Sequence, residues 1–194
     1  MDSIPFAFCD AVVGTIKDLP RVDVPFPDAK WNSALQDYSA NRECYQLHVG
    51  FYDGKWSYRL HNAKLSSKAL LTTLLQQVGP KYLRIDYIEC VAGGRVLPET
   101  SNEKLHALIK SLKPFLNFPR LSLYDFYSTI PESDLDQLLS SFAKTNICWF
   151  HSNGSRPSVT EFAKQLRQED TLVKKITVHG ATSECNCGLW GSSC

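Results

Sequence analysis

Three copies of a helix-start signal, evenly spaced in the second half of the chain, constrain its fold most strongly. Each copy is a Ser/Thr-x-x-Glu tetrapeptide, and the copies begin at Thr100, Thr129 and Ser158, 29 residues apart. In this capping box the hydroxyl accepts a hydrogen bond from the third backbone N–H, while the glutamate accepts one from the N–H of the cap residue. A fixed period of this length, with one helix in every unit, predicts a repeat architecture.

Each predicted helix carries a single apolar stripe and lies between short apolar runs that predict strands. The strands are expected at residues 82–90, 121–126, 147–151 and 172–178. Short loops between strands and helices favour parallel strands with all helices on one side. The units therefore predict a degenerate leucine-rich-repeat-like stack, since the strict Leu-x-x-Leu-x-Leu-x-x-Asn pattern is absent. An ordinary open α/β sheet is the alternative.

A β-hairpin is predicted before these repeats. Residues 45–51 and 56–60 alternate between apolar and polar side chains, and Asp53-Gly54 between them supplies the positive φ angles of a two-residue turn. The alternation puts seven large apolar side chains on one face of the hairpin. It puts His48 and His61 on the other face, where they are expected to be neighbours.

The remaining elements are expected to be helical. Residues 3–19 predict one amphipathic helix, the proline-rich residues 20–29 an extended connector, and residues 31–38 a short second helix. A further helix is expected near residues 66–78, after the hairpin.

These elements predict a mixed α/β protein with an N-terminal helix, a hairpin and then strand-helix repeats in a largely parallel sheet. We divide the chain into a helical segment at residues 1–40 and a hairpin-plus-repeat domain at residues 41–180. The Cys/Gly/Ser-rich residues 181–194 are expected to be a disordered tail.

The composition is that of an ordinary globular protein, with 43% hydrophobic and 21% charged residues in a chain of 194. The formal net charge of +1 gives no bulk attraction to nucleic acid or to an anionic membrane surface. No run reaches the roughly 20 apolar residues that a membrane span needs. Because no basic residue precedes Lys17, no secretory signal is expected. We therefore expect the protein in the cytoplasm or the nucleus, without nucleic-acid or membrane partners.

No motif predicts catalysis or a bound cofactor. Gly93-Gly94 follows a predicted strand but lacks the G-x-G-x-x-G or Gly-Lys-Ser/Thr pattern of a phosphate-binding loop. Cys148 and His151 are three residues apart on a strand, so their side chains are expected on opposite faces. The chain is therefore interpreted as a non-enzyme with no catalytic and no cofactor-binding residues.

Seven cysteines are present, and four of them (Cys9, Cys44, Cys90 and Cys148) lie in apolar segments, where a reduced thiol behaves as a small hydrophobic residue. The other three follow His179 in the pattern His-x5-Cys-x-Cys-x6-Cys, which ends at Cys194. These residues are sufficient in number for one tetrahedral zinc ion, but a lone histidine stands where structural sites usually have a ligand pair. From the sequence alone we expect no metal site here.

Several segments resemble a large nematode family of F-box-like proteins. They are the opening Met-Asp-Ser-Ile-Pro-Phe-Ala-Phe-Cys-Asp-Ala-Val, Lys30-Trp31 with Tyr38 seven residues later, residues 54–59 (Gly-Lys-Trp-Ser-Tyr-Arg) and residues 81–85 (Lys-Tyr-Leu-Arg-Ile). The resemblance extends over most of residues 1–180. It rests on patterns of hydrophobic and aromatic residues, and it includes no catalytic constellation.

The resemblance implies that the N-terminal helix docks on the Skp-type adaptor of a cullin-RING ubiquitin ligase, while the rest of the chain captures an unidentified protein substrate. Ile4 and Pro5 would stand for the Leu-Pro that opens an F-box. The adaptor-binding face of its first helix would then be Phe8, Val12, Ile16 and Leu19. The chain departs from the family pattern where residues 20–29 replace most of the second and third F-box helices.

Two other functions are compatible with this sequence. The first is a stand-alone, non-catalytic binding or scaffold domain whose first helix packs on the strand repeats and no longer binds the adaptor. The second is a small intracellular enzyme with an unrecognised site, which would require a cleft lined with titratable groups.

Overall fold

A computed structural model describes residues 4–16, 26, 28–62, 68–69, 78–93, 99–125, 129–168 and 175–179. Within these ranges the helices are α1 (Phe6–Thr15), α2 (Ala29–Asn41), α4 (Asn102–Leu112), α5 (Glu132–Ser141) and α6 (Pro157–Gln168), and a 3-10 turn spans Lys113–Phe115. The strands are β1 (Glu43–Tyr52), β2 (Lys55–Asn62), β3 (Lys68–Ala69), β4 (Leu83–Ala92), β5 (Glu99–Thr100), β6 (Leu116–Tyr124), β7 (Trp149–Ser152) and β8 (Lys175–Val178).

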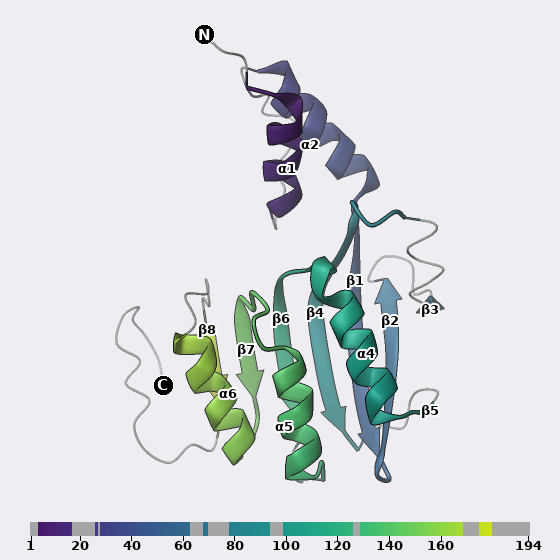
Figure 1. Cartoon of the computed structure of the whole chain (residues 1–194), viewed down its shortest axis with the longest axis vertical. Coiled ribbons are helices and arrows are strands. Elements are labelled where there is room, and N and C mark those ends of the chain that lie inside the picture. Colours follow the sequence, from purple (N-terminus) through teal and green to yellow (C-terminus); the bar gives the residue numbers. More distant parts are fainter. Residues whose placement is uncertain are drawn as a thin grey trace.

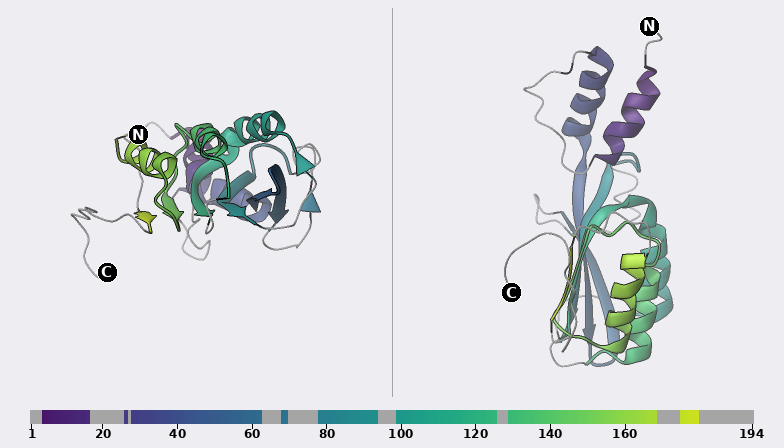
Figure 2. Two further views of the ribbon diagram at one scale, coloured as in Figure 1. Left: turned by 90° about the horizontal axis from the view of Figure 1, so that it is seen from below. Right: turned by 90° about the vertical axis from the view of Figure 1, so that its left-hand side faces the viewer.

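The described strands form one sheet in the order β3-β2-β1-β4-β6-β7-β8, and β5 pairs with β2 (Figure 1). All pairs from β1 to β8 along this path are parallel, whereas the pairs that β2 makes are antiparallel. α4, α5 and α6 lie on one side of the sheet (Figure 2). The prediction of a mixed α/β fold with a mostly parallel sheet is therefore confirmed. We call the side without these helices the open face.

The predicted hairpin is confirmed in detail. β1 and β2 pair through eight residues on each strand, from Tyr45↔Asn62 to Tyr52↔Lys55. Asp53 and Gly54 have φ angles of 49° and 72°, as a two-residue turn with two positive φ angles requires. Six of the seven predicted apolar side chains are buried, and Tyr58 packs half-buried against the same cluster. The alternation of apolar and polar residues thus fixed the register of the hairpin.

The capping box predicted for α4 is displaced by one residue. Thr100 pairs with Trp56 as part of β5, so its backbone belongs to the sheet. Ser101 is the N-cap instead, and its hydroxyl accepts a hydrogen bond from the Lys104 N–H at 3.3 Å. A hydrogen bond from the Ser101 hydroxyl lowers the pKa of Glu103 in the first turn.

The boxes predicted for α5 and α6 do not form. Thr129 binds Asp125 through its backbone N–H and its hydroxyl, and α5 begins after Pro131 without a side-chain cap. Ser158 lies inside the first turn of α6, where its N–H and hydroxyl donate to the Glu132 carboxylate of α5. The helices begin 30 and then 25 residues apart. The 29-residue spacing is therefore wrong as a structural period.

Other boundaries also differ from prediction. The first helix ends at Thr15, because Ile16 is already extended with ψ 123°. Residues 68–69, expected in a helix, form β3 against β2. The rest of the helix expected at residues 66–78 lies outside the described residues, apart from Val78 in a turn. Leu19 and the tail at residues 181–194 also lie outside them.

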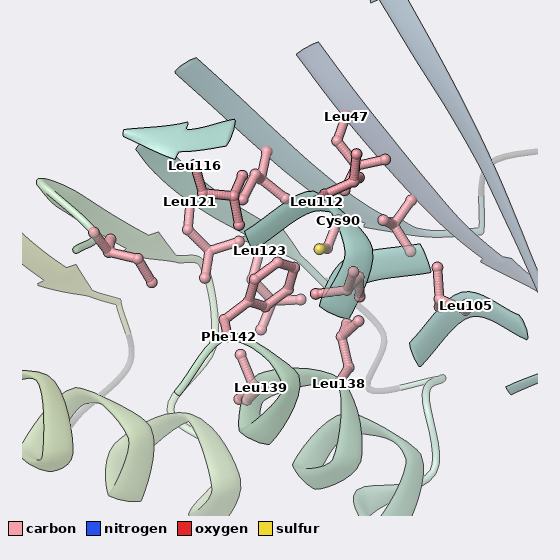
Figure 3. Packing of buried hydrophobic residues seen from close by; sticks show 14 of the residues in the cluster. Leu47, Cys90, Leu105, Leu112, Leu116, Leu121, Leu123, Leu138, Leu139 and Phe142 are labelled. Atoms are coloured by element: carbon pink, nitrogen blue, oxygen red, sulfur yellow. The ribbon is translucent and has the colours of Figure 1, made fainter. Parts of the chain in front are cut away.

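Buried hydrophobic residues form two separate clusters. The large one fills the space between the sheet and α4, α5 and α6, and Figure 3 shows part of it. The small one lies between α1 and α2 and consists of Cys9, Val13, Ala34, Leu35 and Tyr38. The two N-terminal helices therefore have a hydrophobic core of their own, apart from that of the sheet.

Candidate functional site

α1 and α2 lie side by side and run in the same direction, beyond one end of the sheet (Figure 1). At their beginnings, Lys30 Nζ donates to the carbonyl oxygen of Ile4 at 2.8 Å. At their ends, the Arg42 guanidinium donates to the carbonyl oxygens of Val13 and Ile16 at 3.0 and 2.6 Å. The helices approach closely at Gly14, where a Cβ atom would lie 2.7 Å from the Tyr38 hydroxyl oxygen. Glycine is therefore required for this contact.

Polar side chains at the start of β4 attach the helical pair to the sheet. Lys81 Nζ lies 2.7 Å from Asp10 of α1 and 3.0 Å from Asp37 of α2. The Tyr82 hydroxyl donates to the Asp37 carboxylate at 2.7 Å, and Arg84 donates to the Gly14 carbonyl oxygen at 2.8 Å. Hydrogen bonds and ion pairs at the end of the sheet thus connect it to α1 and α2, and Tyr82 also packs against the small cluster.

The attachment predicts a dependence of stability on acid pH. Hydrogen bonds from Tyr82 and Lys81 lower the pKa of Asp37. The bonds formed by the ionised carboxylate therefore stabilise the fold above its ordinary pKa of about 3.9 and are lost as the pH falls through the lowered value. We expect Asp37→Asn to lower the free energy of unfolding by about 1 kcal/mol at pH 7 and to flatten the loss of stability that occurs as the pH falls below about 4. Urea unfolding at several pH values measures both effects.

Asp136→Asn is the control for that experiment, because Asp136 is an exposed carboxylate on α5, away from the helical pair. It should leave the loss of unfolding free energy at acid pH unchanged. If Asp37→Asn lost stability with falling pH as steeply as the wild type does, the role assigned to Asp37 would be contradicted.

The residues predicted to bind an adaptor differ in their exposure. Ile4, Pro5 and Phe8 are exposed, whereas Val12 and Ile16 are half-buried, and Ile16 packs against the small cluster. The sixth predicted residue, Leu19, lies outside the described residues. Cys9 and Val13 are buried in α1, whereas Phe6 and Phe8 of the same helix are exposed.

Further apolar residues extend the exposed end of the helical pair, and the sequence reasoning did not include them. Phe6 and Phe26 are exposed. The Phe8 and Phe26 rings each lie 6.2 Å from the Trp31 ring, measured between centroids. We call Ile4, Phe6, Phe8, Phe26 and Trp31 the N-terminal apolar patch. Phenylalanine next to proline, as in Pro5-Phe6 and Pro25-Phe26-Pro27, is a sequence signal that could have identified two of its members.

The open face of the sheet carries a second group of polar and titratable side chains. The strand registers place Arg59, His48, Glu89, Ser122, His151 and Thr177 in one row across six strands. His48 Nδ1 lies 2.8 Å from Glu89 Oε2, and the His48 and His61 rings are neighbours, as predicted, with centroids 6.1 Å apart. Burial, together with the nearby charges of His179 and Lys175, lowers the pKa of His151.

Three hydroxyl or thiol groups among the described residues are poorly placed to act as nucleophiles. Ser122 lies between Glu89 and His151 in the row, but it is fully buried and cannot reach a substrate. Burial raises the pKa of the Cys90 thiol to about 12, which keeps it protonated at neutral pH. Ser141 contacts His106 Nδ1, but its hydroxyl donates to the Gln137 carbonyl oxygen of its own helix at 2.9 Å.

A polar cluster lies at the carboxyl ends of β6 and β7, where open α/β sheets commonly bind ligands. The Arg156 guanidinium lies 2.7 Å from both Asp125 and Glu132 and donates to the Ile130 carbonyl oxygen. Desolvation raises the pKa of Glu132, but hydrogen bonds from Ser158 and Arg156 outweigh it and hold the pKa below its usual value. Since these charges are paired with one another, the cluster ties β6, α5 and α6 together. The hollow beside it, between α5 and α6, is shallow and lined mostly by polar residues.

Comparison with protein-family models, with curated proteins and with solved structures found no match to this chain. Among the described residues, no helix has the length and apolar character needed to cross a membrane, and no three His, Cys, Asp or Glu residues are grouped to hold a metal ion. The N-terminal apolar patch and the open face of the sheet are therefore the candidate sites for function.

Proposed function

We propose that this protein is a non-catalytic interaction module, specifically a divergent F-box-type substrate receptor of a cullin-RING ubiquitin ligase. The N-terminal apolar patch would dock on the Skp-type adaptor, and the α/β domain would capture a protein substrate. Such a receptor would work in the cytoplasm or the nucleus.

A single observation carries this proposal. The described residues contain five exposed large hydrophobic side chains, and four of them (Ile4, Phe6, Phe8 and Phe26) belong to the N-terminal apolar patch. Scattered exposed hydrophobic residues are normal on a protein surface, whereas a group of them marks an interaction site. Phenylalanine and tryptophan are also typical anchors at the centre of protein interfaces. Ile4, Pro5 and Phe8 are members of the implied adaptor-binding set.

The position of the patch further supports a docking role. It lies at the end of the helical pair that points away from the sheet (Figure 1), so a partner can approach it without contacting the large cluster. α1 and α2 bury their inner residues against each other, and of the patch residues only Trp31 packs against this small cluster. An α1 folded into the sheet core would have left no such face.

For the α/β domain we propose a leucine-rich-repeat-like arrangement. The strands β1, β4, β6, β7 and β8 follow one another across the sheet in chain order, and α4, α5 and α6 all cover one side. This arrangement leaves the open face, with its histidine, tyrosine and tryptophan side chains, available to a protein substrate.

The adaptor interaction is tested with Phe8→Ser, whose side chain is 53% exposed and absent from the small cluster. We expect it to weaken adaptor binding at least about tenfold, because the truncation of a central aromatic anchor typically costs about 2 kcal/mol. Isothermal titration calorimetry with the purified adaptor measures the effect. The control is Tyr52→Ser, which removes a side chain that is 52% exposed at the end of β1 and should leave the affinity unchanged.

Wild-type protein that does not bind the adaptor at micromolar concentration would contradict the proposal. A stand-alone binding or scaffold domain would then be the better interpretation, and the contacts that fasten α1 to β4 favour it. Deletion of residues 1–20 distinguishes the two functions. If α1 serves to dock an adaptor, the remaining domain should lose little stability. If α1 is a structural part of a scaffold domain, the deletion should unfold the protein.

A further inference from the structure

Two rows of side chains cross the open face of the sheet. The first is the row from Arg59 to Thr177, and the strand registers place a second row beside it. The second row consists of His61, Gln46, Tyr87, Arg120, Trp149 and Lys175. Residues that alternate with these rows along the strands, such as Leu60, Leu121 and Ile176, pack into the large cluster. Both rows therefore face away from α4, α5 and α6.

The two rows contain more positive than negative side chains. Arg59, Arg120 and Lys175 are their cations, and Glu89 is the one carboxylate in either row. Glu89 is already paired with a histidine of its own row at 2.8 Å. Asp86, in the bulge of β4 next to the second row, is not without a partner either. Neither acid is therefore left to neutralise the three cations.

The two arginines of these rows have no acceptor in the folded chain. Arg84 and Arg156 donate hydrogen bonds to a carbonyl oxygen and to a carboxylate. Within the described ranges, by contrast, Arg59 and Arg120 have neither a hydrogen bond nor an acidic partner. The Arg59 Nε is shielded from solvent, and the Arg120 guanidinium lies 5.7 Å from the centre of the Trp149 ring. A carboxylate from another molecule would supply the bidentate partner that guanidinium groups favour.

Aromatic rings lie beside these cations. Tyr87 and Trp149 flank Arg120 in its row, and the rings of Tyr124 and His151 lie 5.7 Å apart between centroids. All four side chains are half-buried, so each keeps part of its surface exposed. Tyrosine, tryptophan and arginine are the residues most enriched in the core of protein interfaces. The rings therefore offer contact surface for the backbone and the apolar stems of a peptide.

We propose that the open face binds an acidic, extended segment of a protein, with Arg59, Arg120 and Lys175 as the residues that bind its carboxylates. This inference rests on the proposed function, in which the α/β domain captures a protein substrate, and it names the class of that substrate. The two arginines are three strands apart, which places them at least about 14 Å from each other. An extended peptide spans this distance with roughly four or five residues. Acidic side chains about four residues apart would therefore reach both guanidinium groups.

An acidic peptide suits this face better than a nucleic acid does. Three cations spread over six strands can bind only a few negative charges, whereas nucleic-acid-binding surfaces make many phosphate contacts. Glu89 lies within the first row and would repel a continuous phosphate backbone. A peptide can place an uncharged residue opposite it. The formal net charge of +1 adds no further attraction to phosphate.

The test uses the full chain and a fluorescently labelled random copolymer of glutamate and tyrosine, with binding measured by fluorescence anisotropy. We expect the wild type to bind at micromolar concentration, and the double variant Arg59→Gln with Arg120→Gln to bind at least about tenfold more weakly. Added salt should weaken the binding, because it screens charges at a surface. The matched control is Arg167→Gln, which removes an exposed guanidinium from α6 on the other side of the sheet. It should bind the copolymer as the wild type does.

A second variant separates a loss of contacts from a loss of structure. Glu89→Gln removes the negative charge from the two rows, so the affinity for the copolymer should rise about two- to threefold. A loss of structure would lower the affinity instead. An unchanged or lower affinity of Glu89→Gln would therefore contradict the proposal.

Other outcomes would also overturn it. They are a wild type that does not bind the copolymer at micromolar concentration, and a double variant that binds as tightly as the wild type. Equal binding of a copolymer of lysine and tyrosine would show that charge is not recognised. Tighter binding of a single-stranded thymidine oligonucleotide would make this a nucleic-acid surface. Adaptor binding is titrated separately: binding of the copolymer without the adaptor would contradict only the receptor function, and the reverse result only the inference made here.

Discussion

Arg156→Met is expected to lower the free energy of unfolding by about 3–5 kcal/mol. The Arg156 side chain is 16% exposed and contacts Asp125, whose side chain is only 3% exposed, at 2.7 Å. Without the guanidinium, the Asp125 carboxylate is a buried charge that has lost its cation. The Ile130 carbonyl oxygen and Glu132 lose hydrogen bonds from Arg156 at the same time. The penalty arises chiefly from the unpaired partners, and less from the strength of the ion pair itself.

Urea unfolding followed by circular dichroism measures this loss. Lys164→Met is the control, because Lys164 is 60% exposed and its ion pair with Glu161 has a long distance of 3.8 Å. It should change the free energy of unfolding by less than about 0.5 kcal/mol. The double variant Asp125→Asn with Arg156→Met should recover part of the loss, because it removes the unpaired charge. A loss below about 1 kcal/mol in Arg156→Met would refute the structural role of the cluster.

Phe142→Ala is expected to lower the free energy of unfolding by about 3–5 kcal/mol. Phe142 is the C-cap residue of α5 and is 0% exposed. Figure 3 shows its ring among leucines of the large cluster, which include Leu123 of β6 and Leu139 of α5. Because α5 and the sheet are both fixed by neighbouring elements, the cavity left by the ring cannot close completely.

The same substitution at Phe8 is the matched control. Phe8→Ala removes an identical ring from a site that is 53% exposed, so the loss of stability should stay below about 1 kcal/mol. Thermal and urea unfolding of the two variants compare them directly. Equal losses at the two positions would show that the large cluster is not the main source of stability.

The sequence predicts those parts of the fold that depend on local patterns. The hairpin follows from period-2 alternation around Asp53-Gly54, and both strands lie where that pattern puts them. Helix stripes such as Leu105, Leu108, Ile109 and Leu112 are buried as their spacing requires. In each case the residues that determine the structure are neighbours in the chain.

Features that depend on contacts between distant residues escape the sequence analysis. Thr100 loses its capping role to a strand that pairs with β2, and Ser158 binds a glutamate from the preceding helix. Both tetrapeptides match the local pattern of a capping box. In the folded protein the Thr100 backbone pairs with β2 and the Ser158 hydroxyl binds Glu132, so neither residue caps its helix. In the candidate site, the exposure of Ile4 and Phe8 depends on which side of α1 packs on α2. Because apolar residues occur all around α1, its sequence does not indicate which side packs on α2.

The chain order of β4, β6, β7 and β8 has a consequence for biosynthesis. β6 pairs with β4, β7 with β6 and β8 with β7, so the strand to which each of the last three strands pairs has already been translated. A polypeptide with this layout can acquire its structure progressively during translation, since each crossover closes over a short length of chain. With this strand order, gene duplication or deletion can add or remove a whole βα segment without changing the order or the connections of the other strands.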